Sequence, residues 1–332
     1  MTDTIVAPAT APGPAALAVV RLSGPDAFRV LRALTPAAAS LPEPRRATLV
    51  PLHDPVDGAL LDRALVLVFP APRSYTGEDV VEISGHGGPL SSSLLVEACM
   101  AAGARAAEPG EFTRRAWLNG KMDLVQVEAL PDLVGGRSRA LRSAALNQLE
   151  RGLSGRLAEL RQGLVRLEAL LVHHIDFPEE DEPPVPVEQV LAEAEEVEAG
   201  LRRLLATAPE GELLREGALT VLAGRPNCGK SSLFNALLGV ERAIVTEIPG
   251  TTRDALEAVV SLGGYPFRLV DTAGIREDAE KVERMGIEVA HRYLAQAEIV
   301  LFCIDSAAEG DAPERDFLRE LDTPRVVRVR TK

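Results

Sequence analysis

One glycine-rich turn carries the residues best suited to chemistry, Gly224-Arg225-Pro226-Asn227-Cys228-Gly229-Lys230-Ser231. It matches the spacing G-x-x-x-x-G-K-[ST], with an apolar run at 219–223 before it and a helical pattern at 232–238 after it. In such a turn the backbone N–H groups face bound phosphates, and the N-terminus of the following helix adds positive potential. We expect Lys230 to reach the β- and γ-phosphates and the Ser231 hydroxyl to coordinate Mg²⁺. The turn therefore predicts a nucleoside triphosphate site.

Two later segments indicate that the nucleotide is GTP. One is Asp271-Thr272-Ala273-Gly274, which follows a predicted strand and should bring Asp271 near the metal and the Gly274 amide near the γ-phosphate. The other lies between it and the turn, Ile248-Pro249-Gly250-Thr251-Thr252-Arg253-Asp254, where a threonine can close over Mg²⁺ as a switch. The three segments in this order are typical of a GTPase.

The residue after this aspartate segment is Ile275, at the position where Ras-type enzymes carry a water-orienting glutamine. Isoleucine cannot hydrogen-bond a water, so hydrolysis requires another carboxylate or amide and another source of positive charge. Several acids follow, and the residues alone do not choose among them: Glu277, Asp278, Glu280 and Glu283.

Composition narrows the class of protein. The chain of 332 residues is 46% hydrophobic and 26% charged, which is ordinary for a soluble protein of two or three domains. Its formal charge of −13 disfavours nucleic-acid binding over the whole surface. Its three cysteines lie far apart, which fits a reducing cytoplasm. The apolar runs are shorter than the roughly 20 residues of a membrane helix, so we expect a cytoplasmic chain without a membrane partner.

Three successive patterns divide the chain. Residues 1–118 alternate predicted strands and helices, which favours an α+β domain: strands at 17–22, 64–69 and 80–83, helices at 25–31 and 94–98. Residues 119–215 are helical, and leucines three or four apart from Leu146 to Leu171 predict one long helix, with another at 188–205. Residues 216–332 predict a mostly parallel sheet with strands at 219–223, 267–270, 299–304 and 326–329.

Segments throughout the chain resemble the MnmE (TrmE) family of tRNA-modifying GTPases. Besides the nucleotide motifs, the resemblance rests on residues 3–7, 75–79, 85–88, 109–113, 118–124 and 175–178. It implies an α/β and α fold with an N-terminal α+β folate-binding and dimerisation domain (1–118), the first half of a helical domain (119–215) and an inserted P-loop, Ras-like G domain (216–332).

The resemblance also implies an activity. Members of the family form homodimers through the N-terminal domain and act with MnmG (GidA), an FAD protein, in a heterotetramer. Together they add a carboxymethylaminomethyl or aminomethyl group at C5 of the wobble uridine in tRNA anticodons. The one-carbon donor is 5,10-methylenetetrahydrofolate or 5-formyltetrahydrofolate. In such proteins K⁺ promotes dimerisation of the G domains across the nucleotide and replaces an arginine finger in GTP hydrolysis.

Site residues carried over from the family fall into several groups. GTP contacts match Asn227, Cys228, Gly229, Lys230, Ser231, Ser232, Thr246, Glu247, Ile248, Pro249, Gly250, Thr251, Thr252, Asp271, Thr272, Ala273 and Gly274. The K⁺ ligands match Asn227, Thr246, Ile248 and Thr251, and the Mg²⁺ ligands match Ser231 and Thr252. Glu283 matches the glutamate that acts on the attacking water. Folate contacts match Arg21, Glu82 and Lys121.

Two departures from the family pattern stand out. Pro14-Ala15-Ala16-Leu17 occupies the place of an arginine-glycine-glycine run. The sequence stops at Thr331-Lys332, which look like the first half of the guanine-reading [N/T]-K-x-D motif. We therefore expect a chain truncated within its G domain that binds GTP weakly, discriminates poorly against ATP and has little or no activity.

Two other functions are compatible with parts of the sequence. A ribosome-assembly type of P-loop GTPase would share the turn at 224–231 but lack a counterpart of the first 120 or so residues. A folate-binding module with an inactive, incomplete G domain would bind folate without hydrolysing GTP.

Overall fold

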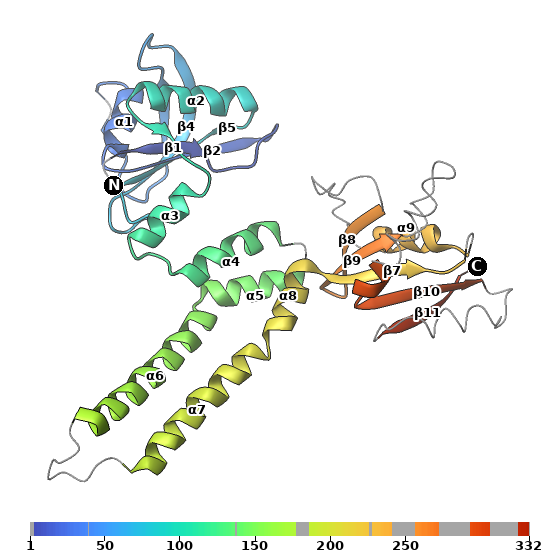
Figure 1. The fold of residues 1–332 in the computed structure, drawn as a ribbon. Coiled ribbons are helices and arrows are strands. Elements are labelled where there is room, and N and C mark those ends of the chain that lie inside the picture. The colour runs from blue at the N-terminus through green and yellow to red at the C-terminus, as the bar shows by residue number, and fades with distance from the viewer. Residues whose placement is uncertain are drawn as a thin grey trace, which may run out of the picture. The chain divides into compact units, whose positions relative to one another are not determined.

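The computed structural model describes residues 3–38, 40–136, 138–176, 186–225, 228–240, 256–271, 293–305 and 325–331 (Figure 1). The chain divides into two compact units, 1–127 and 128–332, which are described in turn. The domain bounds inferred from the sequence remain predictions.

The first unit is built on a six-stranded sheet with the order β3-β4-β5-β2-β1-β6. The strands are β1 (Ile5–Pro8), β2 (Leu17–Ser23), β3 (Thr48–His53), β4 (Leu60–Phe69), β5 (Val80–His86) and β6 (Arg105–Ala106). Neighbours are antiparallel except β1 and β6, which are parallel. The predicted strands 17–22, 64–69 and 80–83 are confirmed, and β4 and β5 are longer than predicted.

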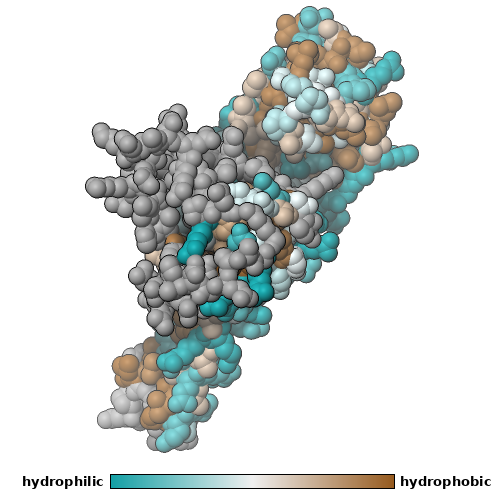
Figure 2. Space-filling view, turned by 90° about the vertical axis from the view of Figure 1, so that its right-hand side faces the viewer, coloured by the Kyte–Doolittle hydropathy of each residue, from teal (hydrophilic) through white to brown (hydrophobic). Residues whose placement is uncertain are grey.

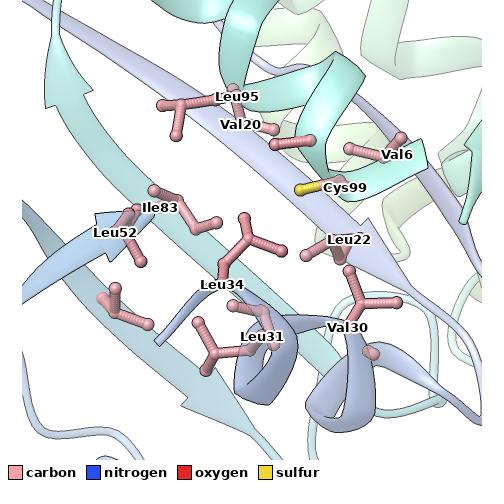
Figure 3. Packing of buried hydrophobic residues seen from close by; sticks show 14 of the residues in the cluster. Val6, Val20, Leu22, Val30, Leu31, Leu34, Leu52, Ile83, Leu95 and Cys99 are labelled. Atoms are coloured by element: carbon pink, nitrogen blue, oxygen red, sulfur yellow. The ribbon is translucent and has the colours of Figure 1, made fainter. Parts of the chain in front are cut away.

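Alternation along the strands separates the two faces of this sheet. Inward residues such as Val20, Leu22 and Ile83 are fully buried. They pack with residues of α1 (Ala27–Leu34) and α2 (Pro89–Ala101), helices that lie in the predicted helical regions. Figure 3 shows Leu34 and Leu95 pointing into this core. Burial of this apolar surface is the main force that holds the unit together, and the residues between the inward ones point to the opposite face.

A helical segment follows, from α3 (Glu111–Leu118) through α4 (Leu124–Gly135), α5 (Arg139–Leu149), α6 (Gly152–Asp176), α7 (Val187–Leu205) and α8 (Ala208–Glu216). Helices α6 and α7 pack side by side (Figure 1). They approach closely where a Cβ on Gly163 would lie 2.7 Å from Val197 Cγ2. Their outer surfaces mix polar and apolar residues, as Figure 2 shows for the visible side, and Leu164 and Leu191 are about half exposed.

The prediction of one long helix from Leu146 to Leu171 was wrong, because α5 ends at Leu149 and α6 begins at Gly152. Arg151 adopts a φ of 66°, which no helix interior accepts. A Cβ on Gly152 would collide with Asn147 Oδ1, so a larger residue there would have to displace the Asn147 side chain. The leucine spacing runs across this turn without interruption, and periodicity alone therefore missed it.

The second sheet has the order β11-β10-β7-β9-β8. Its strands are β7 (Ala218–Ala223), β8 (Leu256–Leu262), β9 (Tyr265–Asp271), β10 (Ile299–Asp305) and β11 (Val326–Thr331). All pairs are parallel except β8 with β9, so the expected mostly parallel sheet is confirmed.

Successive residues of β7 contribute to apolar clusters on the two faces of this sheet. Val221 belongs to one cluster and Leu222 to the other. Helix α9 (Lys230–Val240) adds Phe234 to the cluster of Leu222. The sheet is therefore buried on both sides at its central strand, as parallel sheets usually are. No helix within the described ranges is both long and apolar enough to cross a bilayer.

Candidate functional site

The turn between β7 and α9 holds a buried ammonium group. Lys230 is 7% exposed, and its Nζ donates to the backbone oxygens of Gly224 at 2.9 Å and Arg225 at 2.8 Å. Gly224 has a φ of 139°, and a Cβ there would lie 2.5 Å from the Cys303 carbonyl oxygen. Glycine is therefore required for the chain to curve around the ammonium. This places a positive charge inside the turn, next to the first residues of a helix.

A hydroxyl and a carboxylate meet beside this ammonium. Ser231 Oγ, in the first turn of α9, donates to Asp271 Oδ2 at 2.9 Å, and Asp271 is fully buried at the end of β9. Strands β7 and β9 are parallel neighbours, so their carboxyl ends meet at one edge of the sheet, where ligands of such sheets bind. Oxygen donors of these two kinds suit Mg²⁺. The structure thus brings Lys230, Ser231 and Asp271 together as predicted.

The end of β11 supports the turn from the other side. Thr331 Oγ1 hydrogen-bonds to the Ile304 carbonyl oxygen at 3.2 Å and also to that of Cys228. A Cβ on Gly229 would lie 3.1 Å from Thr331 Cβ, so this glycine permits the close packing. The sequence pointed to Thr331 only as part of a base-reading motif, and its contact with the turn was not foreseen.

Many of the predicted site residues lie outside the described residues: Asn227, Thr246, Glu247, Ile248, Pro249, Gly250, Thr251, Thr252, Thr272, Ala273, Gly274 and Glu283. Of the remaining nucleotide residues, Cys228 is buried beneath the turn and Ser232 is exposed on α9.

All three cysteines are buried. Cys228 and Cys303 adjoin the turn, since a Cβ on Gly224 would lie 2.9 Å from Cys228 Sγ and close to the Cys303 backbone. Burial, assisted by the neighbouring Cys228, raises the pKa of the Cys303 thiol to about 11. Cys99 belongs to the core of the first unit, where burial raises its pKa to about 12. At neutral pH the Cys99 and Cys303 thiols are therefore protonated.

The outward face of the first sheet carries a second candidate site. Arg21 and Glu82 are cross-strand partners on β2 and β5, and Arg21 Nε and Nη2 approach Glu82 Oε1 at 2.9 and 2.7 Å. Their side chains are 25% and 24% exposed, which leaves the pair accessible to a ligand. The structure thus brings together two of the three residues predicted to bind folate. The third, Lys121, donates to the Pro72 carbonyl oxygen at 3.2 Å and packs beside Gly77.

Two aromatic rings, those of Tyr75 and Phe112, also face Arg21. The Arg21 Cζ atom lies 5.1 Å from the centroid of the Tyr75 ring and 5.8 Å from that of the Phe112 ring. Both residues belong to segments on which the family resemblance rests, but the type of residue alone gave no sign that they meet a cation.

Comparison with known proteins agrees with the family resemblance of the sequence. A family model described as the N-terminus of the GTP-binding protein TrmE matches residues 4–121. Another, described as a 50S ribosome-binding GTPase, matches residues 220–332. The chain is 49% identical to the tRNA modification GTPase MnmE of Akkermansia muciniphila over 92% of its length and 69% of that protein. It is 47% identical to the MnmE of Sodalis glossinidius, over 92% of its length and 67% of that protein.

Proposed function

The chain belongs to the MnmE family of tRNA modification GTPases, and on that premise we propose that it binds and hydrolyses GTP at the turn before α9 in the course of modifying tRNA. The observation that carries this proposal is the meeting of Lys230 with the Ser231–Asp271 pair at the carboxyl ends of β7 and β9. A buried ammonium and a helix N-terminus suit the phosphates of a nucleotide, and the two nearby oxygen donors suit the metal ion that those phosphates bind.

Each of these residues has a distinct task. Lys230 exchanges the carbonyl oxygens of Gly224 and Arg225 for phosphate oxygens, so its positive charge moves from the turn to the nucleotide. Ser231 and Asp271 hold Mg²⁺, with Thr252 as a further ligand by family resemblance. When bound, this ion neutralises charge on the phosphates. Glu283 acts on the attacking water, which Ile275 cannot orient.

The second positive charge comes from K⁺, for which Asn227, Thr246, Ile248 and Thr251 are the proposed ligands. A monovalent cation at this position does the work of an arginine finger, which stabilises negative charge in the transition state. The proposal is supported by the family resemblance and by the isoleucine at position 275. It includes dimerisation of the G domains, which would bring the cation sites together.

The tRNA chemistry is proposed for the first unit. Arg21, Glu82 and Lys121 bind 5,10-methylenetetrahydrofolate or 5-formyltetrahydrofolate in a homodimer formed through this unit. Both Arg21 bonds fall on Glu82 Oε1, so Oε2 is placed to accept hydrogen bonds from the amino edge of a pterin. With an MnmG-like FAD protein in the cytoplasm, the enzyme would extend C5 of the wobble uridine.

The test separates the roles of two residues. In the full-length protein, Lys230→Ala should abolish binding of a fluorescent GTP analogue, because the phosphates lose their buried cation. Glu283→Ala should bind the analogue normally but release no phosphate, and replacing K⁺ with Na⁺ should slow wild-type turnover sharply. Arg202→Ala, which removes an exposed cation from α7, serves as the control that leaves nucleotide binding intact. Normal GTP binding by Lys230→Ala would refute the site, and normal hydrolysis by Glu283→Ala would refute the role of that acid.

A further inference from the structure

We propose that Tyr75 and Phe112 are positioning residues that hold the Arg21 guanidinium beside Glu82, and that a buried ion network in turn holds the two rings. The inference rests on the proposed folate-binding role of Arg21 and Glu82. Nothing in the sequence pattern assigns a function to either ring.

The rings act on Arg21 through their faces. A guanidinium within about 6 Å of a ring centroid is attracted by the electron-rich ring face, and both distances, 5.1 and 5.8 Å, meet this limit. The salt bridge to Glu82 restrains the Nε and Nη2 side of the guanidinium. A long, flexible side chain held in this way loses less conformational entropy when a ligand arrives, because it is already ordered.

The two rings come from different segments that are tied together. Tyr75 lies in the loop between β4 and β5, and Phe112 lies in the first turn of α3. The Tyr75 hydroxyl and Thr113 Oγ1, on the same helix as Phe112, are hydrogen-bonded at 3.0 Å. A shift of either segment would therefore move a ring away from Arg21.

A buried arginine joins the same two segments. Arg115 is fully buried, and its guanidinium donates to Glu78 at 3.0 Å and to Glu111 at 2.9 Å. Glu78 lies three residues after Tyr75, and Glu111 directly precedes Phe112. Arg115 also donates to the Asp3 carbonyl oxygen at 2.9 Å and to its carboxylate at 3.0 Å. Breaking any of these contacts would cost a buried charge one of its hydrogen bonds, so the network resists rearrangement.

The burial of the rings favours a role at a site over a role in the core. Tyr75 and Phe112 are both partly exposed, and neither belongs to the apolar cluster of the first unit. Arg21, between sheet and rings, is itself partly exposed. An aromatic side chain that served only for packing would gain more from full burial.

The first experiment measures binding of 5-formyltetrahydrofolate to the full chain by calorimetry. Tyr75→Leu and Phe112→Leu remove the rings, and each should weaken binding by between about 2-fold and 30-fold, the range of a cation–π contact. Tyr75→Phe keeps the ring and should stay within about 3-fold of wild type. Hydrolysis of GTP should be unchanged in all three variants, because the nucleotide site lies in the other unit.

A double-mutant cycle then asks whether the rings act through Arg21. In an Arg21→Ala background, Tyr75→Leu and Phe112→Leu should have little further effect on folate binding. Additive losses would overturn the proposal, because they would mean that the rings serve the ligand without Arg21. Wild-type affinity in both leucine variants would overturn it as well.

A ligand-free measurement keeps the proposal separate from the proposed function. In ¹⁵N NMR spectra, the Arg21 Nε–H should exchange slowly with water in the wild type and Tyr75→Phe, and faster in the two leucine variants. Equal exchange in all four proteins would overturn the positioning role even if folate binds. If folate does not bind to the wild type, the proposed function of this unit fails, and the exchange rates still decide the role of the rings.

Discussion

At the scale of single residues, Glu111 shows how the first unit keeps a charge in its interior. Its side chain is fully buried, yet it accepts hydrogen bonds from Arg105 at 2.5 and 2.9 Å and from the Glu108 N–H at 2.8 Å. The Arg105 bonds are the largest cause that lowers the pKa of Glu111 from 4.5 to about 2, against the opposing effect of burial. The carboxylate is ionised because its donors replace the water that it has lost.

This lowered pKa predicts sensitivity to acid. The contribution of Glu111 to stability is complete above the unfolded-state pKa and is lost as pH falls toward the folded-state pKa of about 2. The difference in pKa corresponds to about 3 kcal/mol. Urea unfolding at pH 7, 4 and 3, followed by fluorescence of Trp117, should show this loss. Trp117 is the single tryptophan and lies on α3 in the first unit.

Matched substitutions isolate the effect. Glu111→Gln should be less stable than wild type at pH 7 and should vary less with pH, whereas Glu108→Gln, at an exposed position, should behave like wild type. Parallel loss of stability with falling pH in wild type and Glu111→Gln would show that another group is responsible.

At the scale of elements, glycines set how closely α6 and α7 approach. A Cβ on Gly163 would lie 2.7 Å from Val197 Cγ2, and one on Gly200 would lie 2.6 Å from Leu160 Cδ2. Val197 is 7% exposed, and its branched side chain has little rotamer freedom in a helix. By contrast, Gly155 on the same helix α6 has no atom within 4 Å of the added Cβ.

These two glycines of α6 should respond in opposite directions to alanine. Gly163→Ala should lower the free energy of unfolding of the second unit by roughly 1–3 kcal/mol, because the methyl group overpacks the contact with Val197. Gly155→Ala should raise it by roughly 0.5–1 kcal/mol, because alanine restricts the unfolded chain without meeting any atom. Chemical denaturation followed by circular dichroism measures both. Equal effects would argue that the helices are not in contact at Gly163.

At the scale of the whole molecule, each unit has a core of its own. The first is centred on β2, β5 and the helices α1 and α2, and the second on the two faces of β7. Folate is proposed to bind the first unit and the nucleotide the second. A ligand stabilises the unit that binds it by about 2.7 kcal/mol at one hundred times its Kd.

The two ligands should therefore act on different unfolding transitions. The unfolding transition followed by Trp117 fluorescence should move to a higher Tm with 5-formyltetrahydrofolate. The same transition should move little with GDP and Mg²⁺. Scanning calorimetry should show a second transition that responds to GDP and Mg²⁺. Lys230→Ala should lose only the nucleotide response. If GDP and Mg²⁺ raised the Tm of the Trp117 transition as much as the Tm of the second transition, the two units would not unfold independently.

Features with a fixed spacing or period could be predicted from the sequence. The turn at 224–231 and the strands that form apolar runs, such as those at 17–22, 219–223 and 299–304, were predicted correctly, because backbone geometry and burial act within a few residues. Strand β3 was not predicted. The turn at Arg151 was missed because its leucine spacing continues across it. The Arg115 network was missed because it joins residues up to 112 positions apart, and no local pattern records such contacts.

The buried cysteines have a practical consequence for spectroscopy. Every native thiol is enclosed, and at neutral pH Cys99 and Cys303 hold their protons. Maleimide reagents attack thiolates that they can reach. A single cysteine placed on the surface, for example at the exposed Ser93, should therefore take up a fluorophore while the native ones remain unlabelled. The native cysteines therefore need not be replaced before a single surface cysteine is labelled.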